Sequence, residues 1–235
     1  MSTIEERYQD VLQKFEAVCN KTGKKAGEVE LIAVSKNFPA DYAQKIYDLG
    51  QRNFGENRAQ EMAEKYAVLP QDIRWHFIGR LQRNKVKYII DKACMIHSVD
   101  SVALAEEISR QAVLKDVHMP ILIQVNLDEE ETKAGFEENE LKQALQTISS
   151  LPNLQVRGLM TIGAYHEEPE DSRPLFKRMS ALFGQVDQWQ IPGVVMQSLS
   201  MGMSHDFTVA IEEGASFVRV GSSIFGKRIY EKRDS

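Results

Sequence analysis

The sequence predicts one α/β domain that folds as a single (β/α)8 TIM-type barrel with an extra N-terminal helix. Its 235 residues are enough for one large α/β domain. Eight short β-rich runs alternate with segments of helical periodicity, and several runs are apolar on both faces, as parallel strands covered by helices should be. A doubly wound open sheet is the alternative, but eight nearly even units favour closure into a barrel.

The predicted strands begin after the first helix and continue almost to the carboxyl end. The first helix is expected over residues 3–20, where apolar residues recur at helical spacing and Ser2 and Glu5 have the spacing of a capping box. No linker rich in Gly, Ser or Pro interrupts the chain, so we expect a single domain over residues 1–235. The expected strands are Glu30–Ser35, Asn53–Gly55, Arg74–Ile78, Met95–Val99, Ile121–Asn126, Gln155–Thr161, Val195–Ser200 and Phe217–Gly221.

The composition is that of an ordinary globular protein. The formal net charge is -5, which argues against nucleic acid as a general partner. Cys19 and Cys94 lie far apart without the spacing of a metal site, so we expect free thiols in a reducing cytoplasm. The amino terminus lacks an apolar signal segment and no run is long enough to span a membrane, so we expect an intracellular, cytoplasmic protein.

Small, glycine-containing loops follow the seventh and eighth predicted strands, at Ser198–Ser204 and Arg219–Gly226. In (β/α)8 barrels these two loops often hold a phosphate group. Gly202 and Gly221 allow backbone N–H groups to approach an anion without an intervening Cβ. Small residues that only cap two helices are the structural alternative. The hydroxyl groups that could assist phosphate binding belong to Ser200, Ser204, Ser222 and Ser223.

A single lysine, Lys36, follows the first β-rich run, at the predicted mouth of the barrel. A lysine at a strand end is often merely solvated. Opposite a phosphate site, however, it suggests pyridoxal 5'-phosphate, whose aldehyde forms an imine with lysine and whose phosphate anchors the ring. No metal site is expected, because the histidines apart from His76 show no metal-ligand spacing. These are His97, His118, His166 and His205.

Six motifs in order resemble those of the pyridoxal phosphate homeostasis proteins, the YggS/PROSC family, which is similar to the barrel half of bacterial alanine racemase. The resemblance covers nearly the whole chain. The motifs are Leu31–Lys36, Asn53–Asn57, Trp75–Lys85, Gly158–Thr161, Leu199–Asp206 and Val218–Gly226.

This resemblance implies a role for each matching residue. Lys36 is expected to be the imine lysine, and Arg219 to lie near the pyridine nitrogen, where a permanently charged guanidinium keeps that nitrogen unprotonated. Asn57 and His76 are expected to line the pocket, with structural roles as an alternative. The residues expected around the phosphate are Ser200, Met201, Gly202, Ser204, Gly221 and Ser222.

Three functions fit these residues. The first is a monomeric carrier, without enzymatic turnover, that holds pyridoxal phosphate for vitamin B6 homeostasis and delivers it to apoenzymes. The second is an amino-acid racemase, but the resembled enzymes take a second base from another domain, for which we expect no residues because this chain ends at Ser235. The third, weaker one is an aldolase-like barrel that acts on a sugar phosphate. A mobile flap over the pocket is considered at residues 129–136, while the roles of Gln82, Asn84 and Lys85 stay open between helix capping and ligand contact.

Overall fold

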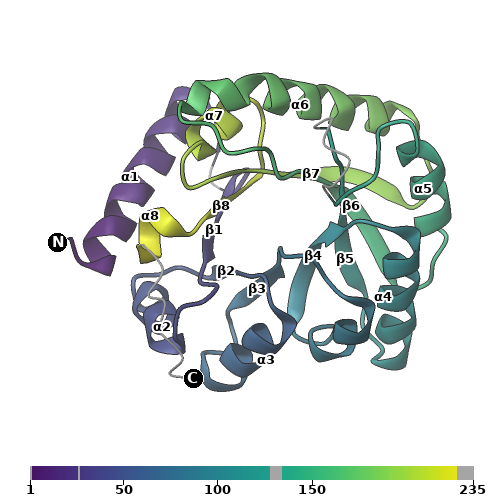
Figure 1. Cartoon of the computed structure of the whole chain (residues 1–235), viewed down its shortest axis with the longest axis horizontal. Coiled ribbons are helices and arrows are strands. Elements are labelled where there is room, and N and C mark those ends of the chain that lie inside the picture. The colour runs from purple at the N-terminus through teal and green to yellow at the C-terminus, as the bar shows by residue number, and fades with distance from the viewer. Residues whose placement is uncertain (1, 26, 128–133, 227–235) are drawn as a thin grey trace, which may run out of the picture.

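Eight parallel strands close a barrel in the order of the chain (Figure 1), so the predicted (β/α)8 fold is confirmed. The computed structural model describes residues 2–25, 27–127 and 134–226. The barrel closes through pairing of β1 with β8, in which Ile32 lies opposite Arg219. The strands are β1 (Glu30–Val34), β2 (Asn53–Glu56), β3 (Arg74–Phe77), β4 (Ala93–Val99), β5 (Met119–Gln124), β6 (Leu154–Met160), β7 (Val194–Met203) and β8 (Phe217–Val220).

Helices form a ring outside the barrel (Figure 1). Most are amphipathic, and their apolar residues pack with the outward-facing strand residues in one large hydrophobic core. The extra helix α1 packs against α2, α7 and α8. The helices are α1 (Ile4–Lys21), α2 (Ala40–Asp48), α3 (Ala59–Val68), η1 (Arg83–Tyr88), α4 (Val102–Leu114), α5 (Leu141–Ile148), η2 (Pro169–Ser172), α6 (Arg173–Gln188), α7 (Phe207–Glu212) and α8 (Ser222–Phe225), where η denotes a 3-10 helix.

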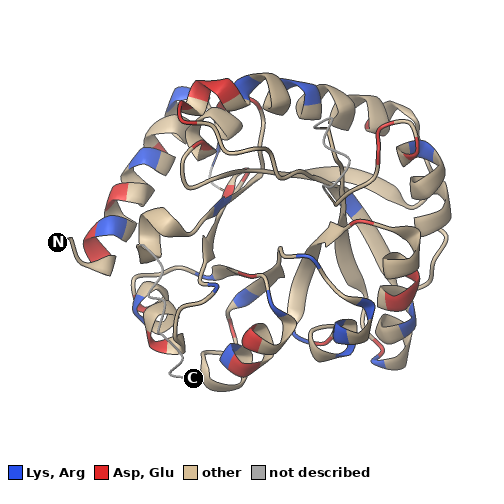
Figure 2. Cartoon of the chain, viewed as in Figure 1, with Lys and Arg blue, Asp and Glu red and all other residues tan. Residues whose placement is uncertain are grey.

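The inside of the barrel is partly apolar and partly polar. Ile32, Val34, Ile78 and Phe217 form a small cluster separate from the main core. Several polar side chains from β3, β4, β7 and β8 are also buried, and the ring of Phe217 packs against two of them, His76 and His97. Charged residues gather on the outer helices, whereas most of the strand surface carries none (Figure 2). The polar groups inside the barrel are therefore unusual for a packed core and indicate a specific role.

The predicted bounds differ from those of the structure by one to three residues, and two of the differences have a clear physical reason. The capping box of α1 is formed by Thr3 and Glu6, one residue later than expected: the Thr3 hydroxyl accepts from the N–H of Glu6 at 3.1 Å, and a Glu6 carboxylate oxygen accepts from the N–H of Thr3 at 2.8 Å. The sequence satisfies the capping pattern in both frames. Strand β7 also continues to Met203 instead of ending at Ser200, because Met203 still pairs with Arg219 of β8.

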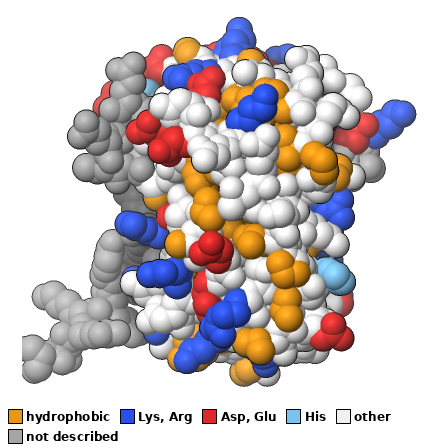
Figure 3. Space-filling view, turned by 90° about the vertical axis from the view of Figure 1, so that its right-hand side faces the viewer, with side chains coloured by type: hydrophobic (Ala, Val, Ile, Leu, Met, Phe, Trp, Pro, Cys, Tyr) orange, Lys and Arg blue, Asp and Glu red, His pale blue; other side chains and the backbone are white. Residues whose placement is uncertain are grey.

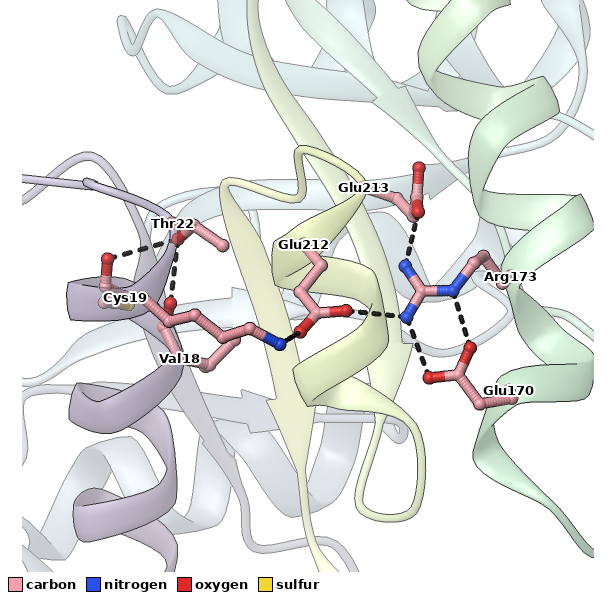
Figure 4. A network of polar contacts seen from close by, with 8 residues as sticks. Val18, Cys19, Thr22, Glu170, Arg173, Glu212 and Glu213 are labelled. Atoms are coloured by element: carbon pink, nitrogen blue, oxygen red, sulfur yellow. Dashed lines mark hydrogen bonds and ion pairs between the residues drawn. The ribbon is translucent and has the colours of Figure 1, made fainter.

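An ion-pair network fastens the outer helices near the amino-terminal end of α6 (Figure 4). The Arg173 guanidinium bridges Glu170, Glu212 and Glu213 at 2.5–2.6 Å. Lys21 at the end of α1 also pairs with Glu212, at 2.7 Å. Helices α1, α6 and α7 are thus linked across the outside of β7 and β8, the two strands that carry the predicted phosphate loops.

The face that carries α4 and α5 shows hydrophobic side chains dispersed between charged ones (Figure 3). Val113 and Leu114, near the end of α4, are among the exposed large apolar residues. Such scattered residues are normal on a protein surface. Within residues 2–25, 27–127 and 134–226, no helix is both long and apolar enough to cross a bilayer.

Candidate functional site

A cavity of about 330 Å³ lies at the carboxyl-terminal ends of the strands. This is the face on which (β/α)8 barrels place their functional residues, and the volume lies in the range of small-ligand sites. Lys36 and Phe38 contribute from the segment after β1, Asn57 from the segment after β2, and Arg219 from β8. The complete lining is Val34, Lys36, Phe38, Asn57, Ile78, Ile162, Ala164, Tyr165, His166, Met203, Ser204, His205, Asp206, Arg219, Gly221, Ser222 and Gly226.

The two predicted phosphate loops are joined to one another beside this cavity. The Ser204 hydroxyl oxygen accepts from the N–H of Gly221 at 2.9 Å, and the Ser223 hydroxyl donates to the Ser204 carbonyl at 3.2 Å. The Asp206 carboxylate also holds the first loop. It accepts from the N–H of Met203 at 2.6 Å and from the Ser172 hydroxyl at 3.0 Å. The loops therefore present a fixed edge of small residues to the cavity, and an anion there would compete with Ser204 for the Gly221 N–H.

Arg219 reaches the cavity from inside the barrel and is only 5% exposed. Its Nη1 donates to the Ser200 hydroxyl oxygen at 2.6 Å and its Nη2 to the Thr161 carbonyl at 2.8 Å. Burial lowers the pKa of Arg219 to about 10, with the Asp206 carboxylate opposing the shift. Since that value is still well above neutral pH, the guanidinium keeps its charge and donates hydrogen bonds only.

A chain of buried hydrogen bonds continues from Ser200 across the barrel. His97 Nδ1 lies 3.0 Å from the Ser200 hydroxyl oxygen, and His97 Nε2 lies 2.9 Å from His76 Nδ1. His76 Nε2 lies 3.1 Å from Asn53 Oδ1, and Asn53 Nδ2 donates to the Glu30 carboxylate at 2.8 Å. The chain thus connects the cavity with Glu30 at the opposite end of the strands.

The two ends of this chain are compatible with one set of proton positions. At the cavity end, the Ser200 oxygen accepts from Arg219, and its hydroxyl proton is available to be donated to His97 Nδ1. At the far end, a carboxylate only accepts, so the Asn53 amide nitrogen faces Glu30 and its oxygen accepts from His76 Nε2. The Asn53 contact therefore places a proton on His76 Nε2, and with both rings neutral the same order of donors puts the His97 proton on Nε2 as well.

Burial supports the neutral state of both rings. It lowers the pKa of His76 to about 3, with a further contribution from the Arg74 charge. It also holds the pKa of His97 well below its ordinary value, and the neighbouring His76 and Arg219 shift it in the same direction. Two uncharged imidazoles therefore connect a buried cation to a carboxylate without adding charge of their own.

The structure brings six of the ten predicted site residues together in the lining of the cavity. Those six are Lys36, Asn57, Ser204, Arg219, Gly221 and Ser222. The other four lie behind the lining: Ser200 and His76 belong to the buried chain, Met201 packs in the main core, and Gly202 faces α7. Their contact with a cofactor stays a prediction, as do the roles assigned to the six.

The sequence did not identify several residues of the site. Tyr165 and His205 contribute rings to the cavity with centroids 5.5 Å apart, and His205 lies in the quoted motif Leu199–Asp206, which was the available signal. His97 gave no signal because it has no neighbouring histidine in sequence, and only the barrel brings it beside His76. No cluster of three or more potential metal ligands occurs in the part of the chain that the structure describes.

The considered flap at residues 129–136 falls mostly outside the described residues. Its described end, Phe136, is bonded to the segment after β5: the N–H of Phe136 donates to the Gln124 carbonyl at 2.8 Å, and the N–H of Asn126 donates to the Phe136 carbonyl at 3.0 Å. Lys85 and Gln82 lie with Arg80 and Arg83 in a neighbouring groove that shares Asn57 with the cavity.

Comparison with known proteins agrees with the resemblance found in the sequence. The family model of the alanine racemase N-terminal domain matches residues 11–229. The pyridoxal phosphate homeostasis protein of Aquifex aeolicus is 44% identical over 226 residues, which cover 96% of this chain and 98% of that protein.

Two solved structures place the fold. PipY of Synechococcus elongatus, with pyridoxal phosphate bound, is 37% identical, with a TM-score of 0.82 over 95% of this chain and all (100%) of that one. Alanine racemase of Corynebacterium glutamicum is 19% identical, with a TM-score of 0.67 over 92% of this chain and 60% of that one. The racemase therefore supports the fold alone, whereas PipY and the Aquifex protein match throughout.

Proposed function

This chain belongs to the family of alanine racemase N-terminal domains and, within it, to the pyridoxal phosphate homeostasis proteins, and on that basis we propose that it binds pyridoxal 5'-phosphate in the cavity and serves vitamin B6 homeostasis. The observation that carries the proposal is the convergence of three groups on one cavity. These are Lys36, the buried cation Arg219, and the joined loops at Ser204 and Gly221.

The residues present fit this cofactor. The Ser204 and Ser222 hydroxyls and the N–H groups of the second loop would hold the phosphate, and Lys36 would hold the aldehyde carbon as an imine. Arg219 would face the ring nitrogen with a donor, because a guanidinium has no acceptor, and so keep that nitrogen unprotonated. The cofactor would supply the aldehyde carbon that an amine can bond, and an electron-withdrawing ring.

The proposed role is a carrier without turnover. An unprotonated ring nitrogen weakens the ring as an electron sink, and the buried Arg219 favours that state. The matching homeostasis proteins support the same reading. A racemase remains the alternative to test, because Tyr165 and His205 at the cavity are groups that can exchange protons.

The proposal also covers the location of the protein, its oligomeric state and its recipients. A cytoplasmic monomer that hands its cofactor to apoenzymes fits the acidic composition and the dispersed apolar residues of the face in Figure 3. Mixing the loaded protein with an apoenzyme and following the recovery of that enzyme's activity tests delivery, and light scattering tests the monomer.

The decisive experiment is the visible absorption of the purified protein after incubation with pyridoxal phosphate, before and after borohydride. We expect an imine band that borohydride abolishes, with the added mass on the peptide that contains Lys36. Lys36→Ala should lose the band, whereas Lys177→Ala, which changes an exposed lysine on α6, should keep it. A colourless wild-type protein without an adduct would overturn the proposal and favour the alternative in which the ligand is a sugar phosphate.

A second measurement separates the carrier from an enzyme. The loaded protein is incubated with L-alanine in heavy water, and exchange at the α-carbon and formation of the D-isomer are followed. We expect neither above the rate given by free pyridoxal phosphate. Exchange that depends on Tyr165 or His205 would instead establish the racemase alternative.

A further inference from the structure

The peptide groups on both sides of Lys36 are held by two side chains of α3. The carbonyl of Ser35, which belongs to the peptide before Lys36, accepts from Lys65 Nζ at 2.7 Å. The N–H of Asn37, which belongs to the peptide after Lys36, donates to Glu61 Oε1 at 2.6 Å. Lys65 and Glu61 are themselves paired at 2.9 Å, so one ion pair on the helix holds both peptides.

Lys65 is fully engaged in this arrangement. Only 4% exposed, its ammonium donates to the Ser35 carbonyl, to Glu56 Oε1 at 2.6 Å and to Glu61 Oε1, which accounts for its three N–H groups. Glu56 Oε1 also accepts from the Ser35 hydroxyl at 2.6 Å. The end of β1 is therefore fastened to α3 and to β2 immediately before Lys36.

The buried cluster of Lys65, Glu56 and Glu61 is not well explained as a means of stabilising the fold. Two carboxylates surround one ammonium, burial raises the pKa of Glu56, and Glu56 Oε2 has no hydrogen-bond partner among the described residues. A buried ion pair is generally no more stabilising than apolar residues of the same size. Such a cluster is better explained by the geometry that it imposes.

The imposed geometry is a specific turn after Lys36. Asn37 has a φ of 64°, in the left-handed region that residues other than glycine seldom adopt. Its N–H is bonded to Glu61, and the N–H of Phe38 returns to the Ser35 carbonyl at 3.1 Å. The backbone at Lys36 thus has one defined direction at the edge of the cavity.

We propose that Lys65 and Glu61 are positioning residues that fix the backbone of Lys36 so that its amine is directed into the cavity. This inference rests on the proposed function, in which that amine bonds the cofactor's aldehyde carbon. In that step the uncharged amine attacks the carbon, a C=N bond forms and the aldehyde oxygen leaves as water. The lysine side chain is long and flexible, so it does not orient its own amine and depends on the direction of its backbone. Loss of the fixed backbone should therefore slow imine formation while leaving phosphate binding unchanged.

The test compares two ligands on Glu61→Ala, Lys65→Met and the control Glu64→Ala, which removes an exposed carboxylate from the same helix. Pyridoxal 5'-phosphate can bond to Lys36, whereas pyridoxine 5'-phosphate carries an alcohol in place of the aldehyde. We expect imine formation with Glu61→Ala to be roughly tenfold slower or more, with the affinity for pyridoxine 5'-phosphate within twofold of wild type. Glu64→Ala should match wild type with both ligands.

A conservative variant and a cofactor-free measurement complete the test. Glu61→Gln keeps an oxygen that accepts from the Asn37 N–H and should recover part of the rate. In cofactor-free Glu61→Ala, the Asn37 amide should exchange its hydrogen faster than in wild type. If Lys65→Met does not fold, Glu61→Ala alone carries the comparison, since its side chain is partly exposed.

The outcomes are distinct. The positioning role would be overturned if Glu61→Ala formed the imine at the wild-type rate. It would also be overturned if the variant lost binding of pyridoxal 5'-phosphate and pyridoxine 5'-phosphate equally. Absence of an imine band in wild-type protein would overturn the proposed function instead, and Asn37 exchange would still report whether Glu61 holds the turn.

Discussion

Ser200→Ala tests whether the buried hydrogen-bond chain supports Arg219. The change removes a hydroxyl whose oxygen accepts from Arg219 Nη1 and whose O–H donates to His97 Nδ1, at a position that is 0% exposed. Loss of a hydrogen bond to a charged group and an unpaired acceptor on His97 together should lower the free energy of unfolding by roughly 2–5 kcal/mol. For a chain of this length that corresponds to a fall in melting temperature of roughly 5–20 °C.

Urea unfolding of the cofactor-free protein, followed by circular dichroism, measures this change directly. Ser150→Ala is the matched control, because Ser150 is exposed and its hydroxyl donates to the nearby Thr147 carbonyl. We expect a change within about 0.5 kcal/mol. Nitrogen NMR of the imidazoles adds a second readout, with Nε2 protonated on both His76 and His97 in wild type. If Ser200→Ala is as stable as Ser150→Ala, or if either ring is protonated on Nδ1, the chain as described is wrong.

The remaining predictions concern backbone packing and pH. Gly202→Ala should destabilise the protein by roughly 2–4 kcal/mol in thermal unfolding, because φ is 86° and the new Cβ would lie 2.4 Å from Ala210 Cβ. The control Gly184→Ala, whose Cβ would meet no atom of the described residues within 4 Å, should leave stability unchanged or slightly raised. Equal effects of the two changes would contradict this packing. Stability should fall as pH decreases from about 6.5 towards 3, because the unfolded chain protonates at the ordinary histidine pKa while His76, with a pKa of about 3, and His97 stay neutral in the folded protein. A His76→Gln/His97→Gln double variant should show a shallower fall, measured by urea titrations at each pH, and an unchanged slope would contradict the assignment.

The sequence alone determined the fold class and the family, and it predicted the end of the barrel at which the candidate site lies. These signals are local in the chain: the alternation of strand and helix patterns indicated the barrel, and the position of Lys36 and the two small loops at strand ends indicated the functional face. In a closed parallel barrel all strand ends of one kind meet, so residues distant in sequence could be assigned to one face without knowing their contacts.

Only the tertiary structure decided which contacts these side chains make. Ser200 is expected near the phosphate from its hydroxyl beside a loop and from the family resemblance, and that contact stays a prediction. The structure adds that β7 continues past Ser200 and that its hydroxyl lies within hydrogen-bond distance of Arg219 and His97. In the sequence, Lys65 is one of several charged residues of an amphipathic helix and is not distinguished from the others. In the structure it is buried beside the peptides that flank Lys36. These roles depend on strand register and on contacts between residues far apart in the chain, which a periodic sequence pattern does not specify.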